Sequence, residues 1–139
     1  MIRSAPVLAV LVLAGACGDG RPRAVVTSPE GEPRLEVAVE IAETAEARMR
    51  GLRGWTALEP DEGLLLVFPT EGEVCLVNED VPFAIDAVFA DASGAVVAIE
   101  REVPAGDATP RCHPGTARVL EVAAGVAAPV APDDLLVVR

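Results

Sequence analysis

The sequence predicts an α+β domain that is mostly β, with an antiparallel, barrel-like sheet and one or two short helices. Short apolar segments with strand-like patterns outnumber the single segment that carries helix-capping residues. Glycine, proline and aspartate separate these segments at short intervals, which is typical of hairpin connections. Hydrophobic residues make up 51% of the 139 residues, enough to bury a core without metals or several disulfides.

The first strand is expected at residues 35–41. Leu35, Val37, Val39 and Ile41 alternate with Glu36, Ala38 and Glu40, which places apolar side chains on one face and carboxylates on the other. This pattern predicts a half-buried strand.

A helix of two turns at most is predicted over residues 45–50. Thr44 can cap its first turn, and Gly51 can adopt the left-handed conformation that commonly ends a helix.

The later elements are expected to be short strands at residues 64–68, 74–77, 85–90, 95–99, 118–122 and 135–138. The Asp-Ala-Ser-Gly turn at residues 91–94 should join two of them as a hairpin. Residues 103–115 contain three prolines and two glycines, so we expect a long irregular loop there.

Composition excludes nucleic acid as a partner. The chain carries 22 acidic and 11 basic residues, a formal net charge of −11 at pH 7, and such a surface repels a phosphate backbone. Aromatic residues make up only 3% of the chain, too few for a platform on which bases or sugars stack.

The first seventeen residues are expected to direct export and lipid attachment. Arg3 precedes an apolar run over residues 5–13, and the small residues 14–16 lead directly to Cys17. This ending resembles the bacterial lipobox, after which the cysteine becomes the new N-terminus and carries lipid. The resemblance implies a lipoprotein signal peptide over residues 1–16 and a membrane anchor at Cys17. A plain secretory cleavage beside a chance cysteine is the alternative.

This N-terminal pattern predicts a location and a domain organisation. The expected location is the bacterial cell envelope, on its periplasmic or surface face, with the membrane as a partner through lipid on Cys17. Residues 17–33 are rich in glycine, proline and charge, which predicts a flexible tether. Residues 34–139 are expected to form one globular domain.

Three cysteines are informative in an exported chain. If Cys17 takes lipid, Cys75 and Cys112 remain as a pair, and an even remainder in an oxidising compartment predicts a disulfide. Their Cα atoms should then lie about 4.4–6.8 Å apart. The alternative is a metal or redox site formed by Cys75, Cys112 and His113, although neighbouring residues of a strand face opposite sides. We expect no metal.

Several short motifs occur in an order that resembles the domain of unknown function 192 family. The resemblance covers about residues 35–138 and rests on Gly51-Leu52, Gly63-Leu64-Leu65, Asn78, Pro82, Asp86, Phe89, Gly94, Pro104, Val119-Leu120-Glu121 and Gly125. This chain departs from the family pattern at Arg53 and Leu64, where the family has methionine, and at Cys75-Leu76, where it has Trp-Met. The resemblance implies a compact, mostly β fold and no established reaction.

Two acids match motif positions of that family. Asp86 and Glu121 both lie in apolar strands, where a free carboxylate is costly. A pair of carboxylates in one cleft can perform acid–base chemistry, but each acid can equally be structural. We expect Asp86 to share the face of Val88 and to pair with Arg50, Arg53, Arg118 or backbone donors near Asn78.

Two functions follow from these residues. The first is a binding or accessory domain whose cleft near Asn78, Asp86 and Glu121 accepts a small ligand or an envelope protein. The alternative is a small hydrolase or lyase that uses Asp86 and Glu121 as acid and base. The chain has no Gly-rich phosphate loop, no Ser-His-Asp spacing and no zinc-type histidine cluster, so no cofactor is expected.

Overall fold

A computed structural model of the chain describes residues 18–139. In this part the chain forms one helix and seven strands in the order β1 (Arg23–Thr27), β2 (Pro33–Ala42), α1 (Ala45–Arg50), β3 (Glu62–Leu76), β4 (Ile85–Ala90), β5 (Val96–Val103), β6 (Arg111–Ala123) and β7 (Leu135–Val138). The mostly β, α+β class predicted from the sequence is confirmed.

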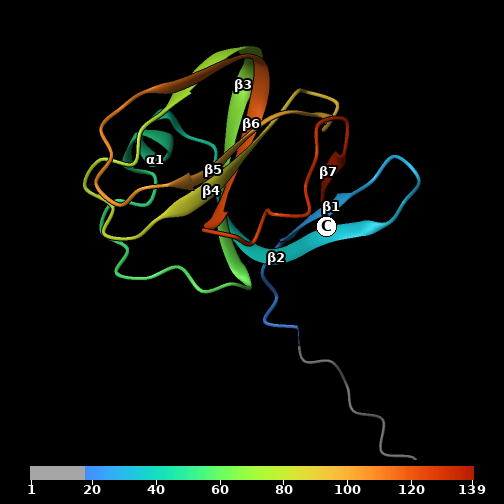
Figure 1. Ribbon diagram of the computed structural model, residues 1–139, viewed down its shortest axis with the longest axis horizontal. Coiled ribbons are helices and arrows are strands. Elements are labelled where there is room, and N and C mark those ends of the chain that lie inside the picture. The colour runs from blue at the N-terminus through green and yellow to red at the C-terminus, as the bar shows by residue number, and fades with distance from the viewer. Residues whose placement is uncertain (1–17) are drawn as a thin grey trace, which may run out of the picture.

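The seven strands form a single sheet in the order β5-β4-β6-β3-β2-β1-β7, curled into a half-barrel (Figure 1). Strands β2 and β3 run parallel, joined by the crossover that contains α1, while the other neighbouring strands are antiparallel. The sheet is therefore mostly antiparallel, as expected, but mixed rather than purely antiparallel, because the β2–β3 pair is parallel. A parallel pair needs a long crossover, and residues 43–61 supply it.

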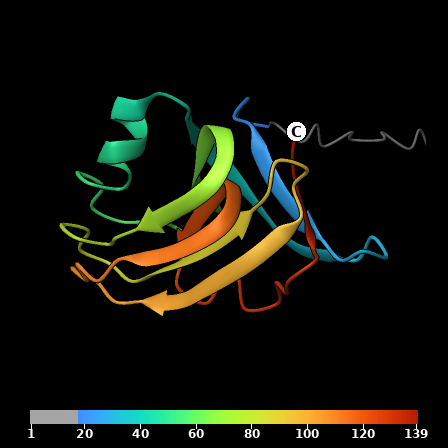
Figure 2. The ribbon, with the colours of Figure 1, turned by 90° about the horizontal axis from the view of Figure 1, so that it is seen from above.

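Helix α1 forms as its caps predict. The Thr44 side chain accepts a hydrogen bond from the Ala47 backbone N–H, and Gly51 ends the helix with φ of 51°. None of its six residues is fully buried. Figure 2 shows the helix beside the sheet rather than inserted into it.

Strand β1 corrects the predicted tether. Residues 23–27 pair with β2 on one side and with β7 on the other, and Ala24, Val25 and Val26 are buried. The glycines and prolines on both sides of this short strand led to the prediction of a tether. Its partner β7 lies at the far end of the sequence, so local sequence does not indicate the pairing. Only residues 18–22 separate Cys17 from the sheet, and Cys17 itself lies outside the described residues.

Strands β3 and β6 are longer than predicted. The segments expected at residues 64–68 and 74–77 are one strand that continues through Pro69, because β6 pairs with both parts across two irregularities. Strand β6 begins at Arg111, so the irregular loop predicted for residues 103–115 is reduced to residues 104–110. Long-range pairing overrides the local proline signals here.

The core has one apolar cluster on each face of the sheet. Val26, Val39, Val88 and Leu120 belong to the cluster on one face. The cluster on the other face consists of Ala42, Leu52, Leu58, Leu64, Leu66, Val74, Leu76, Val81, Ile85, Ala87, Phe89, Val103 and Val119. Each face of the central strands is thus buried, which explains the fully buried pattern of β4.

The turn at residues 91–94 forms as predicted and brings the two ends of the sheet together. Gly94 has φ of 93°, and a Cβ there would collide with the Leu136 carbonyl oxygen. A bridge between Ala95 and Leu135 links the turn to β7. Within residues 18–139, no helix is long and apolar enough to cross a membrane.

Candidate binding cavity

The two candidate acids lie on opposite faces of the sheet. On the paired strands β4 and β6, Asp86 is opposite Val122 and Ala87 is opposite Glu121. Residues opposite each other share a face and successive residues alternate, so Asp86 and Glu121 face away from each other. The structure does not bring them into one cleft, which leaves the acid–base pair without its required geometry.

Asp86 is a structural anchor. It is buried and on the face of Val88, as predicted, and its carboxylate accepts hydrogen bonds from the backbone N–H groups of Glu102, Gly125 and Ala127 at 2.8, 2.9 and 3.0 Å. The predicted arginine partners and the donors near Asn78 are wrong. Folding brings β5 and the segment after β6 to this carboxylate, a long-range approach that local sequence does not encode.

Asn78 also performs a structural task. Its side-chain amide is buried and donates to the carbonyl oxygens of Phe83 and Pro104, both at 3.0 Å. Its own backbone N–H donates to the carbonyl of Asp107. The residue thus ties the loop after β3 to the loop after β5 and leaves its amide no donor for a ligand.

Glu121 is different, because it is buried without a partner. The side chain is 3% exposed, and within residues 18–139 its Oε2 atom has no hydrogen-bond partner. Burial in these apolar surroundings raises the pKa of Glu121 to about 8. At neutral pH the group is therefore mainly a protonated carboxylic acid, which can donate one hydrogen bond and accept another.

This acid lines a cavity of about 350 Å³ between α1 and β3. The apolar lining comes from both elements and the loop after β3: Ala45, Met49, Leu52, Leu66, Phe68, Val74, Cys75, Leu76, Val77 and Val81. The volume lies at the lower end of the range usual for small-ligand sites. Neither Asn78 nor Asp86 contributes to the lining, so of the three predicted binding residues only Glu121 reaches the cavity.

Three arginines that the sequence did not identify as site residues also line the cavity. Arg48, Arg50 and Arg53 come from α1 and the turn that follows it. The Arg48 guanidinium lies 5.1 Å from the centre of the Phe68 ring and donates to the Val67 carbonyl oxygen at 2.9 Å. In a chain of net charge −11, they make this a locally basic site. Three arginines within six residues, in and just after the predicted helix, are the signal that the sequence analysis passed over.

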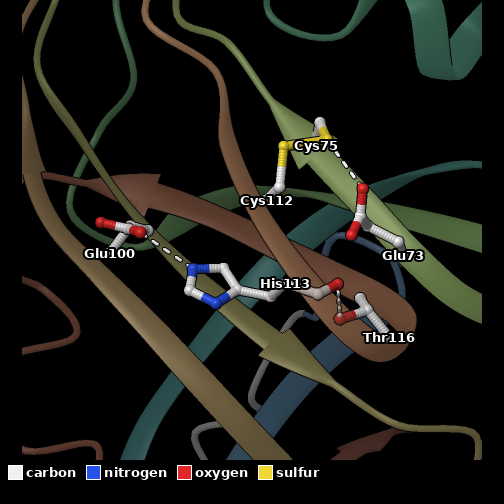
Figure 3. Close-up of a disulfide and its surroundings, with 6 residues drawn as sticks. All are labelled: Glu73, Cys75, Glu100, Cys112, His113 and Thr116. Atoms are coloured by element: carbon white, nitrogen blue, oxygen red, sulfur yellow. Dashed lines mark hydrogen bonds and ion pairs between the residues drawn. A yellow bond between two sulfur atoms is a disulfide. The ribbon is translucent and has the colours of Figure 1, made fainter.

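The predicted disulfide between Cys75 and Cys112 is confirmed (Figure 3). It joins opposed residues of β3 and β6, and the Cα atoms are 4.0 Å apart, somewhat closer than expected, because the two strands are already paired there. His113 points away from the sulfurs toward Glu100, with 2.8 Å between Nε2 and Oε1. The sulfurs are bonded to each other and the histidine lies on the other face, so these three residues do not form a metal site in this state.

Comparison with known proteins identifies the fold but assigns no reaction. Residues 25–137 match the DUF192 family, described as an uncharacterized ACR. No curated protein shows significant similarity to the chain.

Two solved structures share the architecture. One is a protein from Sinorhizobium meliloti 1021, described provisionally as a transcription regulator, with a TM-score of 0.78, 24% identity and coverage of 84% of this chain and 92% of that chain. The other is a protein of unknown function from Novosphingobium aromaticivorans DSM 12444, with a TM-score of 0.77, 24% identity and coverage of 83% of each chain. These similarities establish the fold.

Proposed function

We propose that this chain, which belongs to the DUF192 family, acts as a binding domain. Its ligand is a small molecule or segment with an apolar body and a negative charge. The site is the cavity between α1 and β3, with Glu121 at its lining and Arg48, Arg50 and Arg53 around it.

One observation carries this proposal: the partnerless Oε2 atom of the buried Glu121. A buried polar group without a partner costs about 1–3 kcal/mol, and such groups are rare unless they serve a function. Because Glu121 lines the cavity, a ligand with a hydrogen-bond acceptor would lie beside the protonated acid, while its apolar part covers the side chains of Leu66, Leu76 and Val81. The arginines favour a ligand that is also an anion.

The apolar, anionic dye 1-anilinonaphthalene-8-sulfonate is a suitable first probe. The folded protein should bind one dye molecule with enhanced fluorescence, and Val77→Trp should weaken binding by narrowing the cavity that Val77 lines. Val97→Trp is the matched control, because Val77 and Val97 are similarly exposed, at 37% and 40%, and Val97 does not line the cavity. Equal binding by both variants would contradict the proposed site.

We further propose that this binding domain is held at a bacterial membrane through lipid on Cys17, with residues 1–16 removed as its signal peptide. The support is the sequence pattern before Cys17. Strand β1 begins at Arg23, so an anchored domain would lie close to the lipid surface rather than at the end of a long tether. A ligand of the envelope, or a segment of another envelope protein, is then within reach.

A further inference from the structure

The second half of β3 has a strand on one side only. Strand β2 pairs with β3 as far as Ala42 opposite Leu66, and beyond that point β6 is the only paired neighbour of β3 in residues 18–139. On the open side, the Val67 carbonyl oxygen accepts a hydrogen bond from the Arg48 side chain. An arginine thus occupies the place where a further strand would pair, and the edge beyond it continues along the cavity.

The backbone of Cys75 faces this open edge. In antiparallel strands, opposed residues lie about 5.5 Å apart where they bond to each other and about 4.5 Å apart where they do not. The Cα atoms of Cys75 and Cys112 are 4.0 Å apart, which places them at a position without mutual hydrogen bonds. The N–H and C=O groups of Cys75 therefore point away from β6.

The lining of the cavity agrees with this orientation. Four consecutive residues, 74–77, contribute to it. Successive side chains of a strand point to opposite faces, so a cavity on one face would be lined by alternate residues. A cavity that meets all four adjoins the edge of the strand. Backbone donors and acceptors, as well as side chains, are thus available to an occupant.

The charge around the cavity defines one end of such an occupant. Arg53 lies within 4.0 Å of Glu79 and Asp80 carboxylates, and Arg48 donates to backbone carbonyls. Arg50 lines the cavity and makes no ion pair or side-chain hydrogen bond with any residue of 18–139. It is the cation available to an anionic group.

We propose that the cavity and the open edge of β3 together bind the carboxyl-terminal end of an extended peptide. The peptide backbone pairs with Cys75 as an added strand, an apolar side chain enters the cavity beside Glu121, and the terminal carboxylate contacts Arg50. Strand addition supplies affinity through the backbone, and the cavity and arginine supply specificity. This inference rests on the proposed binding function and names its ligand class.

The test uses the peptide N-acetyl-Ala-Ala-Val-Leu with a free carboxyl group, titrated into the oxidised protein by calorimetry. Amidation of the carboxyl group and Arg50→Gln should each weaken binding by about tenfold or more, as expected for loss of a charged hydrogen bond. Arg139→Gln is the control, since Arg139 is exposed and does not line the cavity. Equal affinity of the free and amidated peptides would overturn the assignment of the carboxylate.

Two further peptides test strand addition itself, with a methyl group on the backbone nitrogen of either the valine or the second alanine. Alternate N–H groups of a strand face its partner, so one methylated peptide should lose binding and the other retain it. Equal binding by both would refute strand pairing. Dimerisation of the protein through this edge in sedimentation, with no peptide bound, would also refute it, because a second copy would then be the occupant.

The dye titration separates the two proposals. If the native protein binds the dye, Val77→Trp weakens dye binding and the peptide does not bind, the peptide inference is rejected and the small-ligand cavity is retained. Failure of both the dye and the peptide to bind would reject the cavity as a binding site and the peptide inference with it.

Discussion

Asp86 and Glu121 are carboxylates on neighbouring paired strands, one register position apart, and they face opposite sides of the sheet. Both are almost fully buried, yet Asp86 accepts three backbone hydrogen bonds while Oε2 of Glu121 has no partner among residues 18–139. The contrast separates a structural acid from a candidate binding acid. Family motif positions alone do not distinguish them, because both acids occupy such positions.

Asp86→Asn should destabilise the fold by about 1–3 kcal/mol, the cost expected when a buried charged hydrogen-bond acceptor is lost. The new amide would turn its N–H groups toward backbone N–H donors of Gly125 and Ala127. Urea unfolding measures the change. Asp61→Asn is the control, since Asp61 is exposed. Equal stability of Asp86→Asn and the native protein would contradict the anchoring role.

Glu121 should make stability fall as pH rises. Its pKa is raised from 4.5 to about 8 on folding, so between these values the folded state binds a proton that the unfolded state has released. The contribution is fully present below pH 4.5 and is lost progressively up to about pH 8, at no more than about 1.4 kcal/mol per pH unit.

Comparison with Glu121→Gln isolates this effect. Urea unfolding at a series of pH values should show a shallower fall in stability for the variant between pH 4.5 and 8, because glutamine does not titrate. The variant should gain stability relative to the native protein as pH rises. Parallel pH profiles for the two proteins would mean that the Glu121 pKa is not raised.

Anion binding in the cavity should also depend on pH. Above about pH 8 the Glu121 carboxyl becomes a buried negative charge that opposes an anionic dye or peptide carboxylate. Affinity for 1-anilinonaphthalene-8-sulfonate should therefore fall between pH 7 and 9 in the native protein and change less in Glu121→Gln. A fluorescence titration at each pH measures this, and identical profiles would exclude Glu121 from the site.

Removal of the disulfide should reduce stability substantially. The bond closes a long loop between Cys75 and Cys112, and the chain-entropy model gives about 3–4 kcal/mol for loops of this size. Urea unfolding should show the same loss of stability, relative to the oxidised native protein, for the reduced native protein and for the double variant Cys75→Ser/Cys112→Ser. A double variant as stable as the oxidised protein would show that strand pairing alone holds β3 to β6.

Cys17 should be the lipidated first residue of the mature chain. Mass spectrometry of the membrane fraction should find a peptide that begins at Cys17 and carries acyl mass, and Cys17→Ser should release the protein from the membrane. A native mature protein that starts at another residue and is recovered in the soluble fraction would contradict the anchor.

The sequence by itself determined the local elements. Helix α1 follows from Thr44 and Gly51, and β2 follows from its alternating pattern, because both signals act within a few residues. The pairing of Cys75 with Cys112 followed from counting cysteines in a chain expected to be exported. These features depend on near neighbours or on composition, which a single sequence contains.

Only the tertiary structure decided what the buried polar residues do. Strand β1 exists because β2 and β7 pair with it, and β3 continues through Pro69 because β6 holds both halves. The register of β4 against β6 sends Asp86 to backbone donors on one face and Glu121 into the cavity on the other. Register is set by contacts between residues far apart in the chain, and a shift of one position would reverse both faces.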